Sequence, residues 1–224
     1  MKKLWMVVLV LFSTITLSKL MAQSRFGAGL TLGLNASQID GDRALGFNKP
    51  GFNAGLRGVV RLTKKFDFGL EMLYSQRGSQ SSLFLNTDAY YFKIKLNYIE
   101  IPFMLVYKDW ETTGVGEVEN GEVVSEETYH RVHFHAGLSY GRLYNASIDQ
   151  VGASQLAQYI THIDKFEKND LSYFVGATFF LKKHLGFTVR FNQSIILNFD
   201  AAKNGISAYN LRNRHLTFGF SYMI

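Results

Sequence analysis

The chain has 224 residues, of which 47% are hydrophobic, 15% aromatic and only 19% charged, with 20 glycines, 2 prolines and no cysteine. This length favours one domain, and the wealth of aromatic residues excludes a largely disordered chain. The lack of cysteine excludes a disulfide framework, a thiolate nucleophile and a zinc finger. The net charge is +6, but half of it comes from three lysines in the first 22 residues.

Residues 1–22 have the features of a cleaved signal peptide. Lys2 and Lys3 form a positive start, residues 4–17 are mainly apolar, and the small residue Ala22 offers a cleavage point. The apolar run is shorter than the ~20 residues of a spanning helix, so an uncleaved anchor is the less favoured alternative. We therefore expect an exported chain with its one domain in the remaining residues.

The mature domain, residues 23–224, carries a net charge of only +3 once the leader lysines are removed. This balance gives little support to nucleic-acid binding, so we expect no nucleic-acid partner. Apolar and polar residues alternate in eight segments of this domain, and a period of two is typical of strands. The eight segments are 26–34, 52–61, 66–75, 90–107, 132–141, 171–181, 187–191 and 215–224.

The fourth segment is irregular. Its apolar phase changes after Tyr98, from Phe92, Ile94 and Leu96 to the opposite parity. A bulge near Tyr98 would absorb one extra residue and place Glu100 on the same side as the preceding lysines.

The two faces of the strands distinguish a membrane barrel from a soluble sandwich. One face is rich in Phe, Tyr and Leu, and the other carries Gly, Ser and Thr with a few charges. Small polar residues suit the interior of a small barrel, and the apolar face would then meet lipid. The sequence predicts an all-β fold, an eight-stranded antiparallel transmembrane β-barrel of the outer-membrane kind, without excluding a soluble ligand-binding barrel.

The lengths of the connections support this fold, because long and short links alternate as they do between surface loops and periplasmic turns. One expected turn, residues 110–128, is instead long and contains six glutamates. The Asn120-Gly121 pair inside it is a strong hairpin signal, so the neighbouring strands are expected to extend into the periplasm as a ribbon. A ten-stranded barrel that uses this insertion is the alternative.

Several stretches resemble the PorT-like family of small outer-membrane β-barrels, which are related in architecture to the OmpA/OmpX-type barrels. The matching stretches cover most of the mature chain and include residues 71–78, with the sequence EMLYSQRG, and 96–102, with LNYIEIP. Residues 29–35 and 213–222 also fit. The resemblance implies an outer-membrane location and, for some members, a role in secretion machinery.

Two motifs carry a chemical interpretation that we weigh against a structural one. Residues 137–141 match the nucleophile-elbow pattern around Ser139, but the strand alternation continues through it, whereas an elbow needs a sharp turn. His133 and His135 lie two apart on one strand face and could share a metal ion, but nothing in the sequence places the inward His215 beside them or supplies another ligand. We expect no enzyme activity, no metal and no cofactor.

The charged residues expected inside the barrel are the candidate functional site. They are Arg57, Arg61, Glu71, Lys93, Lys95, Glu100 and Arg190. Charges in a confined interior need partners, so a paired network that plugs the barrel is favoured over a selective narrow pore.

The expected function is a non-enzymatic structural or accessory role in the envelope, within outer-membrane lipid. Residues 110–128 on the periplasmic side and 145–170 on the outside are the candidate surfaces for an envelope protein partner. A pore or transport protein is the second reading, and an enzyme acting on envelope lipid is the third.

Overall fold

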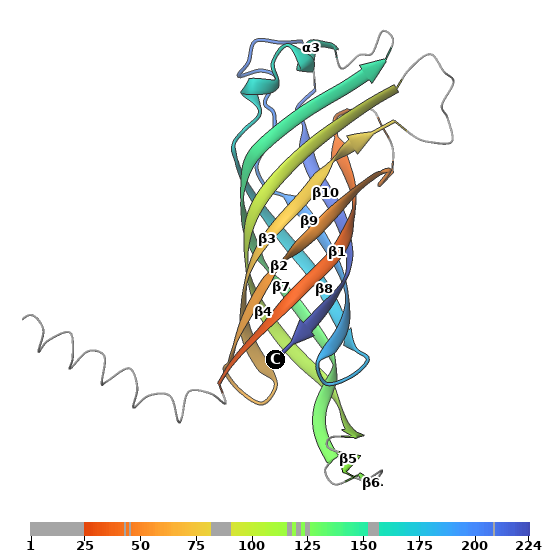
Figure 1. Ribbon diagram of the computed structural model, residues 1–224. Coiled ribbons are helices and arrows are strands. Elements are labelled where there is room, and N and C mark those ends of the chain that lie inside the picture. The colour runs from red at the N-terminus through yellow and green to blue at the C-terminus, as the bar shows by residue number, and fades with distance from the viewer. Residues whose placement is uncertain are drawn as a thin grey trace, which may run out of the picture.

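The computed structural model describes residues 25–42, 44, 46–81, 91–115, 118–119, 122–123, 126–151, 157–207 and 209–224. Eight antiparallel strands close into a ring in the order β1-β10-β9-β8-β7-β4-β3-β2 (Figure 1). The ring confirms the predicted fold class and strand count. The strands are β1 (Phe26–Asp40), β2 (Lys49–Arg61), β3 (Phe66–Gln80), β4 (Tyr91–Val115), β7 (Glu126–Val151), β8 (Asn169–Phe180), β9 (Leu185–Ser194) and β10 (Arg212–Met223). The expected signal peptide, residues 1–22, lies outside the described residues.

The barrel has two unlike ends. Tight turns at residues 62–65 and 181–184, the start of β1 and the end of β10 share one end, which we call the turn end (Figure 1). The opposite loop end carries the longer connections, together with the short helices α3 (Ala157–Ile160) and η1 (Ile163–Lys165). No helix among the described residues has the length and apolar character needed to cross a membrane.

The predicted ribbon is confirmed at the turn end. Strands β4 and β7 remain paired beyond the ring, as far as Val115 opposite Glu126. A separate two-stranded sheet of β5 (Val118–Glu119) and β6 (Glu122–Val123) follows, while the Asn120-Gly121 pair lies outside the described residues. The insertion therefore adds a hairpin below the ring and no further strands to it.

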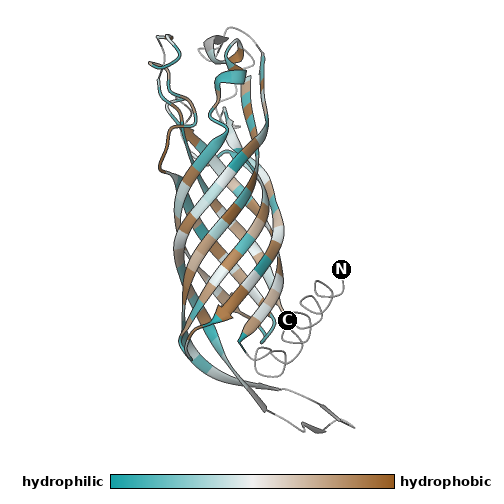
Figure 2. Ribbon diagram, turned by 90° about the vertical axis from the view of Figure 1, so that its left-hand side faces the viewer, coloured by the Kyte–Doolittle hydropathy of each residue, from teal (hydrophilic) through white to brown (hydrophobic). Residues whose placement is uncertain are grey.

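The outer surface of the ring is apolar. Large hydrophobic side chains alternate outward along every strand, and hydropathy alternates with them along the ribbon (Figure 2). On β1 the exposed set ends at Leu34, whereas the strand continues to Asp40. Aromatic residues such as Trp110 and Tyr222 lie near the turn end, and Tyr140 and Tyr144 near the loop end. Such a belt with aromatic borders fits the lipid-facing surface of a membrane barrel.

Strands reach further past this belt at the loop end than the alternation indicated. Strand β7 continues to Val151, so residues 145–151 are strand and only part of the expected 145–170 loop is a connection. Likewise β3 continues to Gln80, which brings Arg77 into the barrel wall.

Candidate functional site

One group of charges fills the half of the lumen nearer the turn end. Glu71 of β3, only 1% exposed, lies between Arg57 of β2 and Arg190 of β9. Arg57 Nε donates to Glu71 Oε1 at 2.6 Å, and Arg190 Nη1 donates to Oε2 at 2.7 Å. We call these three residues the turn-half triad. With every group ionised, the triad carries one net positive charge.

The guanidinium of Arg190 has further partners that hold it in place. Its Nε donates to His135 Nε2 at 3.2 Å, so that imidazole nitrogen serves as an acceptor. Its Cζ lies 4.5 Å from the centre of the Phe174 ring, in cation–π range. Gly176 leaves space for the His135 ring, because a Cβ at this position would lie 2.6 Å from His135 Nε2.

A second group lies nearer the loop end. Arg77, 1% exposed, forms ion pairs with Glu100 of β4 and with Asp170 of β8, the latter at 2.6 Å. We call these three residues the loop-half triad, and with every group ionised it carries one net negative charge. The Tyr98 ring centre lies 4.9 Å from Arg77 Cζ, and Tyr98 Oη accepts a hydrogen bond from Asn198 Nδ2 at 3.1 Å.

A buried apolar cluster lies above the loop-half triad. It combines inward side chains of β1, β4 and β7 with residues from the loop-end connections, and ring contacts join Phe199 to Tyr159 and to Phe166 at 5.3 Å each. We call it the outer plug. Its members are Ile39, Ile94, Leu96, Tyr98, Leu143, Tyr159, Phe166, Phe199, Ala201 and Leu211.

Five of the seven predicted lumen charges face the lumen, in three places. Arg57, Glu71 and Arg190 lie together in the turn-half triad, and Glu100 belongs to the loop-half triad. Arg61 is exposed and lines a cavity at the turn end.

The expected positions of Lys93 and Lys95 need correction. Burial alternates along β4 without interruption, with Ile94, Leu96 and Glu100 inward, so both lysines lie on the opposite, outer face. Lys95 Nζ pairs there with a half-exposed carboxylate, Asp149 Oδ2, at 2.7 Å.

The expected bulge also lies on a different strand. Register shifts between Asn97 and Tyr98, but the unmatched residue is Tyr144 of β7, since Asn145 and Leu143 face consecutive residues of β4. The pairing of β4 with β3 shows no shift there. The apolar phase of β4 therefore changes because its surroundings change: inside the lipid the outer face is apolar, and beyond it the inner face packs into the outer plug.

Arg77 and Asp170 are the site residues that the sequence reasoning missed. The expected strand bounds leave both residues in connections, although each continues the parity of an inward strand face, Arg77 after Glu71 and Asp170 before Ser172. Extending each strand by one further repeat of two residues identifies both as inward-facing residues.

The other chemical motifs lie within barrel strands. Ser139 is buried in the middle of β7 without the strand-to-helix turn of a nucleophile elbow, and its Oγ donates to Glu100 Oε2 at 3.4 Å. The ring of His133 contacts Phe180, 4.4 Å between centres. Within the described ranges, no three His, Cys, Asp or Glu residues are grouped as a metal site.

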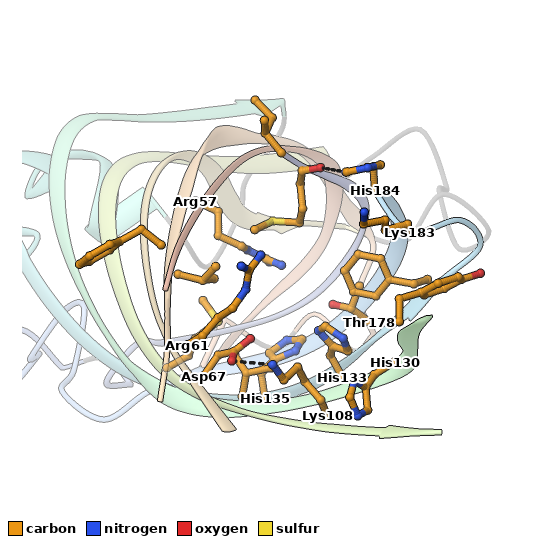
Figure 3. A pocket seen from close by; sticks show the side chains of 18 of the residues that line it. Arg57, Arg61, Asp67, Lys108, His130, His133, His135, Thr178, Lys183 and His184 are labelled. Atoms are coloured by element: carbon orange, nitrogen blue, oxygen red, sulfur yellow. Dashed lines mark hydrogen bonds and ion pairs between the residues drawn. The ribbon is translucent and has the colours of Figure 1, made fainter. Parts of the chain in front are cut away.

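A cavity of about 500 Å³ occupies the lumen below the turn-half triad (Figure 3). Arg57 and Arg61 extend into it from β2, while Lys108 lies beside Asp67, with Lys108 Nζ 2.7 Å from Asp67 Oδ1. Exposed residues such as Lys183 stand at its rim, so the cavity is open to solvent at the turn end. We call it the turn-end cavity.

Comparison with known proteins agrees with this architecture. Residues 21–116 match the family described as outer membrane protein beta-barrel domain. No curated protein sequence matches the chain. A closed antiparallel ring with an apolar exterior is the architecture of outer-membrane β-barrel proteins, and the chain has this fold.

Three solved structures are similar at low sequence identity. The attachment invasion locus protein Ail of Yersinia pestis is 12% identical, with a TM-score of 0.46, over 89% of this chain and 99% of that one. Neisserial surface protein A is 14% identical, with a TM-score of 0.40, over 88% and 96%. OprG from Pseudomonas aeruginosa is 11% identical, with a TM-score of 0.36, over 89% and 95%. Identities and scores at this level carry no inference about function.

Proposed function

We propose that the mature chain, residues 23–224 after cleavage of a signal peptide, is a sealed outer-membrane barrel with a non-enzymatic structural or accessory role in the envelope. The observation that carries this proposal is the filling of the lumen. Two ion-paired triads cross it at different heights, and the outer plug lies above them. An eight-stranded barrel has an interior that side chains can fill, and here they do so along most of its length.

Conductance in a planar lipid bilayer tests the seal. Protein that migrates differently when unheated and boiled, and is therefore folded, should give a flat current trace. Discrete, reproducible current steps from the folded protein would overturn the sealed barrel and favour the narrow pore. The turn-end cavity is the feature that favours the pore as a second candidate, because it opens part of the lumen to solvent.

A link to protein secretion rests on the resemblance to PorT-like barrels and on the ribbon. The paired extension of β4 and β7 places a hairpin beyond the turn end, where a periplasmic partner could reach it. Replacing residues 116–125 by a short Gly-containing turn should leave the barrel folded. If the ribbon serves secretion, cells with this variant should lose secreted proteins as fully as a deletion strain; normal secretion in both strains would contradict the role.

A further inference from the structure

We propose that the turn-end cavity is a binding site for a small organic anion, a phosphate or carboxylate carried on an apolar body. This proposal goes beyond the sealed-barrel function, because binding from the turn end needs no passage through the lumen. The cavity volume of about 500 Å³ lies within the range of small-molecule sites, about 300–1,000 Å³.

The charge of the lining is the first argument. Arg57 and Arg61 from β2, Lys108 from β4 and Lys183 from the turn at 181–184 all line the cavity. Among the described residues that line the cavity, Asp67 carries the one side-chain carboxylate, and Lys108 pairs with it. The carboxylate of Glu71 lies behind the lining and is shared between two arginines, so it does not cancel the excess. The field in the cavity therefore favours an anion.

The geometry of the arginines is the second argument. Both arginines of β2 extend into the same space (Figure 3). Arg57 contacts Glu71 through Nε and Nη2, which holds its guanidinium at the edge of the cavity. A planar guanidinium presents paired N–H groups that match the oxygens of a phosphate or carboxylate.

The remaining lining indicates what the anion is attached to. Met104, Val106, Phe180 and Met223 contribute apolar side chains to the same cavity. Met104, Val106 and Phe180 are buried inside the ring, which distinguishes the site from a surface patch of lysines. An aromatic or short aliphatic group would displace water from these side chains. A bare inorganic ion would leave this part of the cavity unused. The chemistry thus favours an amphipathic anion.

Access restricts the source of the ligand. The two triads and the outer plug close the lumen above the cavity, while its rim at the turn end is exposed. The ligand must therefore enter from the turn end. Two sources have the required chemistry, a soluble organic anion and the headgroup of an anionic lipid in the adjacent leaflet.

Calorimetric titration of the folded barrel tests the site. The full mature chain is placed in phosphatidylcholine nanodiscs and titrated with phenyl phosphate, inorganic phosphate and benzyl alcohol. We expect saturable binding of phenyl phosphate, weaker binding of inorganic phosphate and none of the uncharged alcohol. Absence of saturable phenyl phosphate binding, or equal binding of the alcohol, would overturn the proposal.

Matched variants locate the binding within the cavity. Arg61→Gln should weaken phenyl phosphate binding about tenfold, as expected for the loss of one charge-assisted contact. Lys183→Gln, in a turn, gives an independent test with little risk to folding. Arg142→Gln is the control, because Arg142 is exposed on β7 and its Nη1 donates to Asn169 Oδ1. Equal affinity in wild type and in both cavity variants would reject the site.

A change of lipid separates the two sources. In nanodiscs containing phosphatidylglycerol, a lipid headgroup that enters the cavity should compete with phenyl phosphate and weaken its apparent binding. Unchanged affinity would support a soluble anion, and either result supports the site itself. Because the current measurement reports the seal and calorimetry reports the cavity, failure of one proposal is distinguishable from failure of the other.

Discussion

The two halves of the lumen use the same kind of ion-paired triad with opposite composition. At the loop end a central arginine, Arg77, lies between two carboxylates, and a buried apolar plug covers them. At the turn end a central carboxylate, Glu71, lies between two arginines, and a solvent-accessible cavity adjoins it. The lumen at the loop end is packed with buried apolar side chains, and the lumen at the turn end contains a cavity that is open to solvent.

Because of this difference, we expect the loss of one charged side chain to lower the folding free energy by different amounts at the two ends. An unpaired buried charge is expensive because it has lost its hydration without gaining a partner. Water from the turn-end cavity can reach one side of the turn-half triad, whereas the outer plug keeps water from the loop-half triad. The variants below test this difference, from the largest expected effect to the smallest.

Arg77→Met should have the largest effect. The substitution leaves Glu100 and Asp170 close together without their shared cation, beneath the outer plug. Removing one member of a buried ion pair costs about 3–5 kcal/mol of folding free energy. Urea unfolding in lipid vesicles, followed by circular dichroism, measures the loss. Arg142→Met, at an exposed arginine, is the matched control. A comparable loss of stability in this variant would show that the ion pairs of the loop-half triad do not stabilise the fold.

Glu71→Gln should cost less, about 2–3 kcal/mol, although it also removes the central member of a triad. The amide keeps the shape of the carboxylate, and the cavity lets water reach Arg57. The same unfolding measurement applies. If Glu71→Gln destabilises the barrel as much as Arg77→Met, hydration from the cavity does not lower the cost, and the comparison between the two ends fails.

The strands of the barrel and the members of the turn-half triad could be predicted from the sequence. Alternation identified all eight strands and the lipid-facing side, because lipid demands an apolar outer face along each strand. It also placed Arg57, Glu71 and Arg190 inward together. Parity along single strands was sufficient for these residues, since they lie where the barrel crosses the lipid.

The loop end was less predictable, because the strands there no longer have an apolar outer face and a polar inner face. Beyond the lipid, the outer face of β4 becomes polar and its inner face apolar, which moved Lys93 and Lys95 to the wrong side in the sequence interpretation. Loop-end residues such as Phe199 join the plug only through the tertiary fold. No periodicity along the chain reports such contacts.

The pH dependence of stability should also originate at the loop end. Burial of Asp42, in the connection after β1, raises the pKa of its carboxyl group from 3.8 to about 6. The folded state therefore binds the proton more tightly than the unfolded state, and stability falls as pH rises from about 4 to about 6. A shift of this size corresponds to at most about 3 kcal/mol, and to about 2 kcal/mol with partial hydration.

Asp42→Asn should remove this slope without weakening the fold at low pH. Unfolding in urea at a series of pH values between about 4 and 7 measures it. Asp149→Asn, at a half-exposed partner of Lys95, is the control that should keep the slope. A slope that survives Asp42→Asn would place its origin in another group.

Tyr98→Phe should have the smallest effect, and it reports on the junction between the loop-half triad and the outer plug. The substitution keeps the ring beside Arg77 but removes the hydroxyl that accepts from Asn198 Nδ2 at 3.1 Å and from Asn213 Nδ2 at 3.4 Å. Leaving a buried donor without its acceptor costs about 1–2 kcal/mol. Asn213 and Asn198 remain joined by a second hydrogen bond, in which the Asn213 backbone N donates to Asn198 Oδ1 at 2.6 Å. We therefore expect a loss of about 1 kcal/mol in the free energy of unfolding, measured in urea.

Tyr144→Phe, at an exposed tyrosine of β7, is the control for Tyr98→Phe and should change stability little. Equal losses in the two variants would mean that water already reaches the Tyr98 hydroxyl, and that the loop end is not the dry half of the barrel.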